Sequence, residues 1–240
     1  AFPSYPASWE RVRAAWHRRE FTVPEAMRGK SIFLRFEAVS FRAEVYVNGK
    51  LAGTNEDAFL PFELDVTGLV RPDGPNELLV GVQGHHLFNV NGRATYGWGS
   101  FWGGHIHGIW QDVWLIARPK VRISDAFVMT SVENRTITLQ VTLTNQSGEA
   151  ARVRLNNHVF PADKPAPGSA PEKGFKRMWV EVGPGETRTV TLSEPWASPR
   201  LWWPDDPQLY MLVTRIYPGD EAGEPLDMLP VECVVRGYLS

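Results

Sequence analysis

The segment from Gly92 to Trp110, GRATYGWGSFWGGHIHGIW, concentrates the side chains of this chain that could contact a ligand. Glycine lets a loop bend tightly, and tryptophan combines an apolar face with a polar edge, a surface that matches the C–H patches and hydroxyl groups of a sugar ring. Trp98, Trp102, His105 and His107 are therefore candidate contact residues. Packing of the loop, or filling of a core, is the alternative, because burial is the usual fate of aromatic side chains.

Two histidines of this segment could also contribute to a metal site. His105 and His107 are two residues apart, so on a strand they would share one face, and the adjacent His85 and His86 could approach from elsewhere in the fold. Zinc would need a third or fourth ligand. Cys233 is the single cysteine of the chain, which excludes an internal disulfide and a cysteine-based site. We predict neither a metal nor a cofactor, and structural calcium is left open.

Two carboxylate motifs contain the residue type that acid/base catalysis needs. Asp205 and Asp206 are adjacent within WPDDP, whereas paired catalytic carboxyl groups lie about 5–9 Å apart on opposite sides of the bond they cleave. A solvent-exposed turn is the better interpretation. Glu77 follows Asn76 in DGPNELLVGV, where the asparagine is expected to shape a turn through hydrogen bonds to the backbone.

The elements that would position these residues are β-strands. The stretch FRAEVYVNGKL (Phe41–Leu51) alternates apolar and polar residues and runs into Asn48-Gly49, the pair that tolerates positive φ at both central positions of a type I′ hairpin turn. The same period of two recurs in SIFLRFEAV, in ELLVGV and in TITLQVTL. Alternation of this length, repeated between regular turns, predicts an all-β protein built from sandwiches with one buried face per sheet.

A break in the pattern at Arg118-Pro119 predicts two domains, 1–118 and 119–240. WQDVWLIA reads as a closing strand before it, and VRISDAFVMT opens a new set of strands after it. The second set holds about seven strand candidates, the number that an immunoglobulin-like sandwich needs. The proline-rich stretch Pro161–Gly174 is interpreted as an exposed loop of the second domain, with an interdomain linker as the alternative.

Composition limits the classes of partner. The formal net charge of −2 gives no reason to expect nucleic acid or an anionic membrane surface. No run approaches the roughly 20 apolar residues of a transmembrane helix, and the chain shows no signal-peptide core at its start. A bacterial cytoplasmic and an exported location both stay open, because a single cysteine fits a reducing and an exporting compartment equally well. With 43% hydrophobic residues the chain can bury a sizeable core.

Several motifs together resemble glycoside hydrolase family 2, which includes β-galactosidases, β-glucuronidases and β-mannosidases. In the first domain they are WHRREFTVPE (Trp16–Glu25), GKSIFLRFEAV (Gly29–Val39), AEVYVNGKLAG (Ala43–Gly53), PFELDVT (Pro61–Thr67) and GIWQDVWL (Gly108–Leu115). In the second domain, LWWPDDPQLYML (Leu201–Leu212) resembles the family's Trp-Pro loop and Leu-Tyr strand. The resemblance covers essentially the whole chain and implies a sugar-binding-type jelly roll followed by an immunoglobulin-like domain.

The resemblance also implies where the chemistry lies. In this family a (β/α)₈ barrel, which takes about 250 residues, follows the second sandwich and carries the two glutamates of a retaining mechanism. The family's acid/base glutamate follows an asparagine, as Glu77 does, but here that pair leads into a jelly-roll strand. The chain ends at Ser240, so we expect no catalytic residue in it and no glycosidase activity from it alone.

The same comparison suggests roles for the aromatic residues. In mannosidase-like members the loop corresponding to Gly92–Trp110 carries Gly-Trp-Asp-Trp and reaches the active site. Here the aspartate position is Gly99, which weighs against a mannosidase. Rim contact with the substrate is implied for Trp98, Trp102, His105 and His107. Contact with the barrel is implied for three residues of the second domain, which are Trp202, Trp203 and Tyr210.

The implied partners are a carbohydrate substrate and the catalytic barrel of the same polypeptide, and self-association is left open. Two rival hypotheses remain at this point. The chain could be an autonomous carbohydrate-binding module that uses its aromatic loop as a stacking platform, or a purely structural interaction sandwich. Galactose, glucuronate, mannose and glucosamine specificities are not distinguished by these residues.

Overall fold

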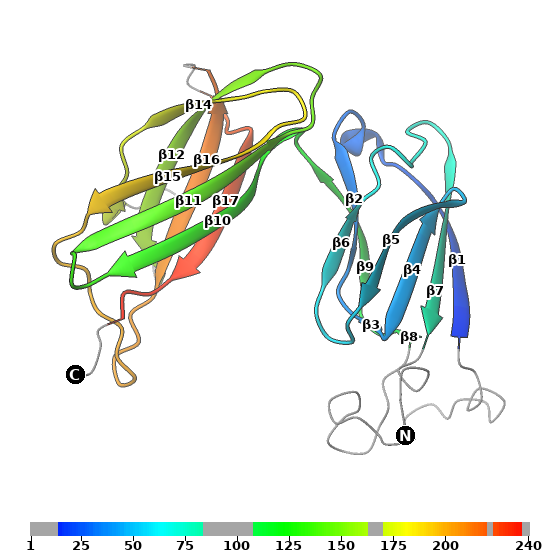
Figure 1. Cartoon of the computed structure of the whole chain (residues 1–240), viewed down its shortest axis with the longest axis horizontal. Coiled ribbons are helices and arrows are strands. Elements are labelled where there is room, and N and C mark those ends of the chain that lie inside the picture. Colours follow the sequence, from blue (N-terminus) through cyan, green and yellow to red (C-terminus); the bar gives the residue numbers. More distant parts are fainter. Residues whose placement is uncertain (1–13, 84–107, 163–169, 220–222, 237–240) are drawn as a thin grey trace. The chain divides into compact units, whose positions relative to one another are not determined.

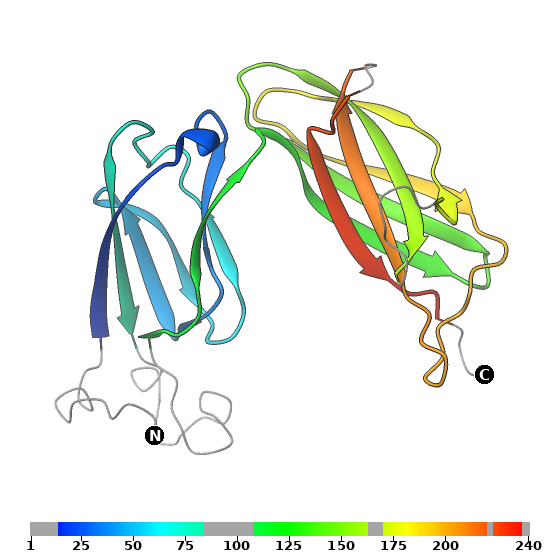
Figure 2. The same ribbon diagram turned by 180° about the vertical axis from the view of Figure 1, so that it is seen from behind.

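The computed structural model describes residues 14–83, 108–162, 170–219 and 223–236, which form two compact units, Ala1–Arg118 and Pro119–Ser240 (Figures 1 and 2). Apart from one short 3₁₀ turn, η2 (Glu25–Met27), the regular elements of these residues are strands. The predicted all-β class, with sandwich-type sheets, is therefore confirmed.

The first unit is a sandwich of a four-stranded sheet, in the order β1-β7-β4-β5, and a three-stranded sheet, in the order β6-β2-β9. A two-stranded piece, β3-β8, completes it. The strands are β1 (Ala14–Thr22), β2 (Ser31–Phe36), β3 (Val39–Ser40), β4 (Arg42–Val47), β5 (Lys50–Glu56), β6 (Phe62–Asp65), β7 (Pro75–Gln83), β8 (Gly108–Ile109) and β9 (Val113–Arg118).

The core of this unit follows the alternation of the sequence. On β4, Ala43, Val45 and Val47 are fully buried, and they pack with alternate residues of β2 and β7. The hairpin between β4 and β5 has positive φ at both central residues, 51° at Asn48 and 78° at Gly49, as the Asn-Gly pair predicts for a type I′ turn. Burial of the apolar face therefore fixes the register of these strands, because a slip by one residue would expose it.

Two asparagines tie this hairpin to the loop before β7. The Asn48 side-chain amide donates to the Leu69 carbonyl (2.9 Å) and to Asn76 Oδ1 (2.8 Å). Asn76 is 1% exposed. Its Oδ1 accepts the Arg71 N–H (2.7 Å), and its amide donates to the carbonyls of Arg71 (3.0 Å) and Gly74 (3.1 Å). Asn76 thus shapes the turn, as its place before the strand predicted.

The second unit is also a sandwich. One sheet has the order β10-β11-β15, and the other has the order β13-β12-β16-β17 with β14 paired to β12. The strands are β10 (Val121–Ser131), β11 (Thr136–Asn145), β12 (Ala151–Pro161), β13 (Lys173–Gly174), β14 (Met178–Val182), β15 (Thr187–Pro195), β16 (Tyr210–Pro218) and β17 (Asp227–Cys233). Because β13 pairs with Val159 and His158 of β12, both ends of the proline-rich stretch belong to this sandwich.

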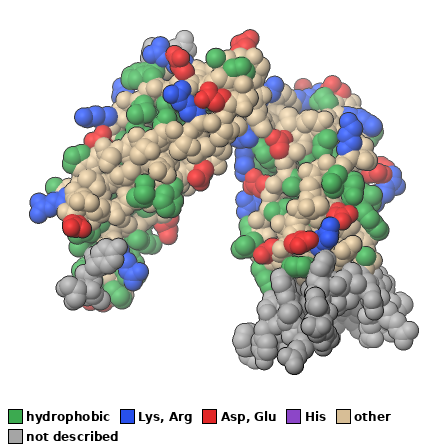
Figure 3. Space-filling view, in the orientation of Figure 1, with side chains coloured by type: hydrophobic (Ala, Val, Ile, Leu, Met, Phe, Trp, Pro, Cys, Tyr) green, Lys and Arg blue, Asp and Glu red, His purple; other side chains and the backbone are tan. Residues whose placement is uncertain are grey.

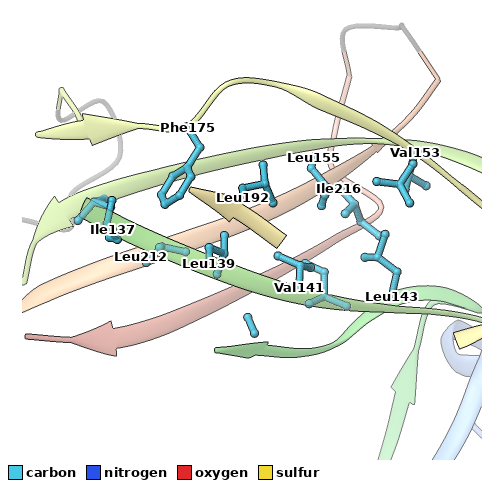
Figure 4. Close-up of a cluster of buried hydrophobic side chains, with 14 of the residues drawn as sticks. Ile137, Leu139, Val141, Leu143, Val153, Leu155, Phe175, Leu192, Leu212 and Ile216 are labelled. Atoms are coloured by element: carbon cyan, nitrogen blue, oxygen red, sulfur yellow. The ribbon is translucent and has the colours of Figure 1, made fainter. Parts of the chain in front are cut away.

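The strand β11 shows best how the second core forms. Ile137, Leu139, Val141 and Leu143 are all fully buried and face the other sheet (Figure 4). On the outer face of β11, Thr138, Thr142 and Thr144 pair with hydroxyl side chains of β15 at 2.9–3.2 Å. In Figure 3 this outer face is part of a broad uncharged band on the second unit. β-Branched threonine suits such a half-exposed strand.

Candidate functional site

The end of the first unit formed by β3 and β8 holds both flanks of segment 84–107. Phe41 N–H donates to the carbonyl of Gln83, the last residue of β7 (3.1 Å). Gly108, the first residue of β8, pairs with Ser40. The two flanking residues are therefore held by neighbouring positions of the chain. The segment richest in candidate contact residues must leave and re-enter the sandwich at this one end.

The four rim candidates themselves lie outside the described residues. Trp98, Trp102, His105 and His107 all fall within positions 84–107, as do the histidines at 85 and 86. Their predicted contacts with a substrate stay predictions. Among the residues that the structure describes, no group of three or more His, Cys, Asp or Glu side chains could hold a metal ion.

Described side chains at the same end add an apolar surface that the sequence analysis did not single out. The indole N–H of Trp110 donates to the Ala58 carbonyl (2.9 Å), and its ring meets the edge of Phe59 at 6.0 Å between centroids. Phe59 and Leu60 are 46% and 64% exposed. Asp57 Oδ1 accepts the N–H groups of both, each at 2.7 Å. The short loop is thus held in a shape that presents apolar side chains to solvent.

Buried polar atoms without a partner also occur on the strands that lead to this end. Ser40 Oγ and Asn55 Nδ2 have no hydrogen-bond partner within the described part of the chain, and Ser40 is 1% exposed. Most buried polar groups are paired, so each exception calls for a physical explanation. Ser40 is also the residue that pairs with Gly108. This end of the sandwich therefore combines exposed apolar side chains with buried polar atoms that no described residue pairs.

In the second unit, the two adjacent tryptophans lie partly exposed on a turn. Trp202 N–H donates to the Val235 carbonyl (2.8 Å), and the guanidinium of Arg236 lies over the Trp202 ring at 5.0 Å. Trp203 and Asp206 exchange two backbone hydrogen bonds of 3.1 Å. Trp202 and Trp203 thus keep part of their surface available, and their predicted contact with a further domain stays a prediction.

Tyr210 is placed differently from its sequence-based expectation. It is 0% exposed, and its ring packs edge-on against Trp196 at 4.9 Å between centroids. Its hydroxyl accepts the Arg200 N–H (2.8 Å) and donates to Glu172 Oε1 (2.9 Å). A contact of this side chain with a barrel is therefore wrong for this structure, because Tyr210 is at the centre of its own sandwich. The Leu-Tyr motif reflects packing of the second unit.

Neither carboxylate motif forms a catalytic pair. Glu77 lies on β7 and accepts a hydrogen bond from Arg18 Nε, and the same guanidinium contacts Glu20 (3.3 Å). Asp205 and Asp206 are exposed in the turn after Trp203. The charge of Glu77 is balanced by Arg18 on an open sheet face, and Asp205 and Asp206 are exposed to solvent. Neither arrangement encloses a bond between two carboxyl groups.

The single thiol of the chain is chemically passive. Burial, with a smaller contribution from Glu232, raises the pKa of Cys233 to about 11. The thiolate is the reactive form, so little of it is present near neutral pH.

Among the described residues, no helix is both long and apolar enough to cross a bilayer.

We expect Cys233 to react slowly with Ellman's reagent at pH 8 in the folded chain. A thiol with an ordinary pKa of about 8.5 is roughly a quarter ionised at that pH, and one with a pKa of about 11 is roughly a thousandth ionised. The reaction should therefore be about 250-fold slower than in urea-unfolded chain, where the reference pKa returns. Equal rates in the two states would show that the thiol is neither buried nor perturbed.

Both units match sequence models of the same protein family. The sequence model "Glycosyl hydrolase 2 galactose-binding domain-like" matches residues 4–109, and the model "Glycosyl hydrolases family 2" matches residues 121–227. The two matches follow one another along the chain without overlap.

Curated relatives and solved structures agree with these matches. A β-galactosidase of Halalkalibacterium halodurans is 27% identical over 223 residues, covering 91% of this chain and 20% of that protein. A β-galactosidase of Streptococcus thermophilus is 32% identical over 228 residues, covering 92% and 19%. The crystal structure of a Bacteroides uniformis β-glucuronidase shares the fold, with a TM-score of 0.77 at 24% identity over 93% of this chain and 26% of that chain. This chain thus spans about a fifth of the two β-galactosidases.

Proposed function

The chain belongs to glycoside hydrolase family 2, and from that premise we propose that it is the non-catalytic N-terminal region of a retaining glycosidase that releases terminal β-linked sugars. The first unit would present segment 84–107 to the rim of an active site. The second unit would brace a catalytic (β/α)₈ barrel of the same polypeptide, and the barrel would supply the acid/base and nucleophile glutamates.

One observation carries this proposal. Gln83 and Gly108 are both fixed beside Ser40 and Phe41, so a segment of four candidate sugar-contacting side chains is attached at one end of a rigid sandwich. Binding residues are commonly placed on loops that a rigid scaffold positions. Beside these anchors, Phe59 and Leu60 leave apolar surface exposed, as expected of a surface that meets another body.

The carboxylates of the chain support a non-catalytic role. A retaining mechanism needs two carboxyl groups about 5 Å apart across a bound sugar. Glu77 lies on an open strand face beside Arg18, and Asp205 and Asp206 lie in an exposed turn. The chain also spans only 20% of the H. halodurans β-galactosidase, which leaves ample length for a barrel in proteins of that size.

We expect the purified chain to show no turnover of nitrophenyl β-galactoside, β-glucuronide, β-mannoside or β-glucoside above the buffer rate. The reason is that neither Glu77 nor the pair Asp205 and Asp206 forms a catalytic arrangement of two carboxyl groups. The matched control is Glu77→Gln, which removes the glutamate of the Asn76-Glu77 pair. Turnover well above buffer that this substitution abolishes would place catalysis in the chain and refute the proposal.

A further inference from the structure

The outer face of the sheet β1-β7-β4-β5 carries an exposed aromatic side chain lying on a glycine. Trp16 of β1 is opposite Gly81 of β7 and is 58% exposed. A Cβ atom on Gly81 would come within 2.8 Å of the Trp16 ring. The glycine therefore lets the indole lie against the neighbouring strand instead of standing away from the sheet.

From Trp16 an apolar strip crosses all four strands. The Trp16 ring lies 6.0 Å from Tyr46 of β4, centroid to centroid. Tyr46 is opposite Leu79 of β7 and Leu51 of β5, and Leu51 is 54% exposed. These four side chains, which we call the Trp16 strip, point away from the core, whereas Leu78, Val80 and Val45 on the same strands are buried in it. With strands about 4.8 Å apart, the strip is about 14 Å long.

Polar side chains border the strip on both sides. On one side Arg18 contacts Glu20 and Glu77. On the other, the Tyr46 hydroxyl lies 3.4 Å from Glu44, and Arg42 contacts Glu44 (3.3 Å) and Glu56 (3.6 Å). Carboxylates accept hydrogen bonds and guanidinium groups donate them, so the borders offer both kinds of group beside an apolar centre.

This combination fits a carbohydrate better than a protein. Sugar rings have C–H patches that stack on an indole and hydroxyl groups that both donate and accept. A stable protein interface needs about 20–30 residues on each side with a large apolar centre, whereas this strip has four apolar side chains. Its length exceeds one ring, which favours several linked sugars over a monosaccharide.

We propose that the Trp16 strip binds an oligosaccharide, with the Trp16 indole as its stacking platform and the bordering carboxylates and guanidinium groups as hydrogen-bond partners; that the sugars are β-linked rests on the proposed function. The site lies on a sheet face of the first unit, and its Gly81 lies two residues before Gln83, one of the two anchors of segment 84–107. It would hold the polymeric part of a carbohydrate while chemistry occurs elsewhere. The binding does not depend on catalysis, so it can be measured on the chain alone.

Isothermal titration calorimetry of the chain with β-1,4-galactotetraose and with cellotetraose tests the proposal. We expect binding of at least one of them, weakened about tenfold or more by Trp16→Ala. Gly81→Ala keeps the tryptophan but places a methyl group within 2.8 Å of its ring, and should weaken binding several-fold by displacing the platform. The control is Trp114→Ala, which removes a tryptophan of similar exposure, 53%, from β9 in the other sheet, and should leave binding unchanged.

Three outcomes would overturn the site. The chain could bind neither tetrasaccharide, the Trp16→Ala variant could bind as the unchanged chain does, or Trp114→Ala could lose binding equally. Sedimentation of the same samples tests the rival occupant. A concentration-dependent dimer that Trp16→Ala abolishes would show that a second copy of the chain covers the strip, and would replace the carbohydrate proposal. Glycosidase assays do not enter this test, so its failure is separable from failure of the proposed function.

Discussion

Replacing Asn76 by alanine should destabilise the first unit by about 3 kcal/mol and leave the second unit unchanged. The substitution removes four hydrogen bonds of a side chain that is 1% exposed. Each buried group left without a partner costs about 1–3 kcal/mol. The Arg71 N–H and carbonyl and the Asn48 amide would be affected together, so the loss falls in the upper part of the usual range for single substitutions.

Urea denaturation of the whole chain, followed by residue-specific NMR signals from each unit, would measure this effect. Asn134→Ala is the matched control, because Asn134 is exposed and surface substitutions usually change stability by less than about 0.5 kcal/mol. The experiment also examines the predicted boundary at residues 118 and 119. If Asn76→Ala lowered the midpoints of both units equally, they would unfold as one body and the proposed independence of the two sandwiches would fail.

A loss of similar or larger size is expected in the second unit from Tyr210→Ala. Large aromatic-to-alanine changes in cores cost about 3–5 kcal/mol. Tyr210 is fully buried and packs edge-on against Trp196, and its hydroxyl holds Arg200 and Glu172 together. In this variant the urea midpoint of the second unit should fall, and that of the first unit should not change. A change below about 1 kcal/mol would mean that the loop from Trp196 to Tyr210 is not fixed by this ring.

Tyr210→Phe separates the hydroxyl from the ring. We expect a loss of about 1–2 kcal/mol. Burial, together with the hydrogen bond to Glu172, raises the pKa of Tyr210. The folded state therefore prefers the protonated phenol, and this stability is present below the ordinary pKa of about 10 and is lost as the pH rises through the higher folded value. The decline of stability above pH 10 should accordingly be steeper for the unchanged chain than for Tyr210→Phe.

Alternating sequence predicted the strand faces well. The buried residues of β4 and β11 follow the period of two, and Asn48-Gly49 forms the expected turn. Such patterns are local, because neighbouring side chains on a strand point to opposite faces. The buried pair Asn157 and Thr214 was not predicted. The two residues are directly opposite on β12 and β16, both are 0% exposed, and no hydrogen-bond partner for their side chains occurs among the described residues.

Features that depend on pairing between strands distant in the sequence also could not be predicted from the local alternation. The position of the Trp16 ring depends on a glycine in β7, and only the register of β1 and β7 brings them together. The family resemblance implied that Tyr210 contacts a barrel, but its register on β16 places it in the core. At the candidate site, the sequence located the aromatic segment, whereas its anchors needed the structure: Gly108 is held by the pairing of β3 with β8, and Gln83 by the N–H of Phe41.

The anchoring of Gln83 and Gly108 beside Ser40 and Phe41 has an evolutionary consequence. The sandwich closes through these backbone contacts whatever residues stand between them. Doubling the length of a loop whose ends are already fixed costs only about 0.6 kcal/mol of closure entropy. Insertions, deletions and exchanges between positions 84 and 107 can therefore accumulate without a matching change in the core. Under the proposed function, such changes would alter the contacts of this end with a sugar while related proteins inherit the same scaffold.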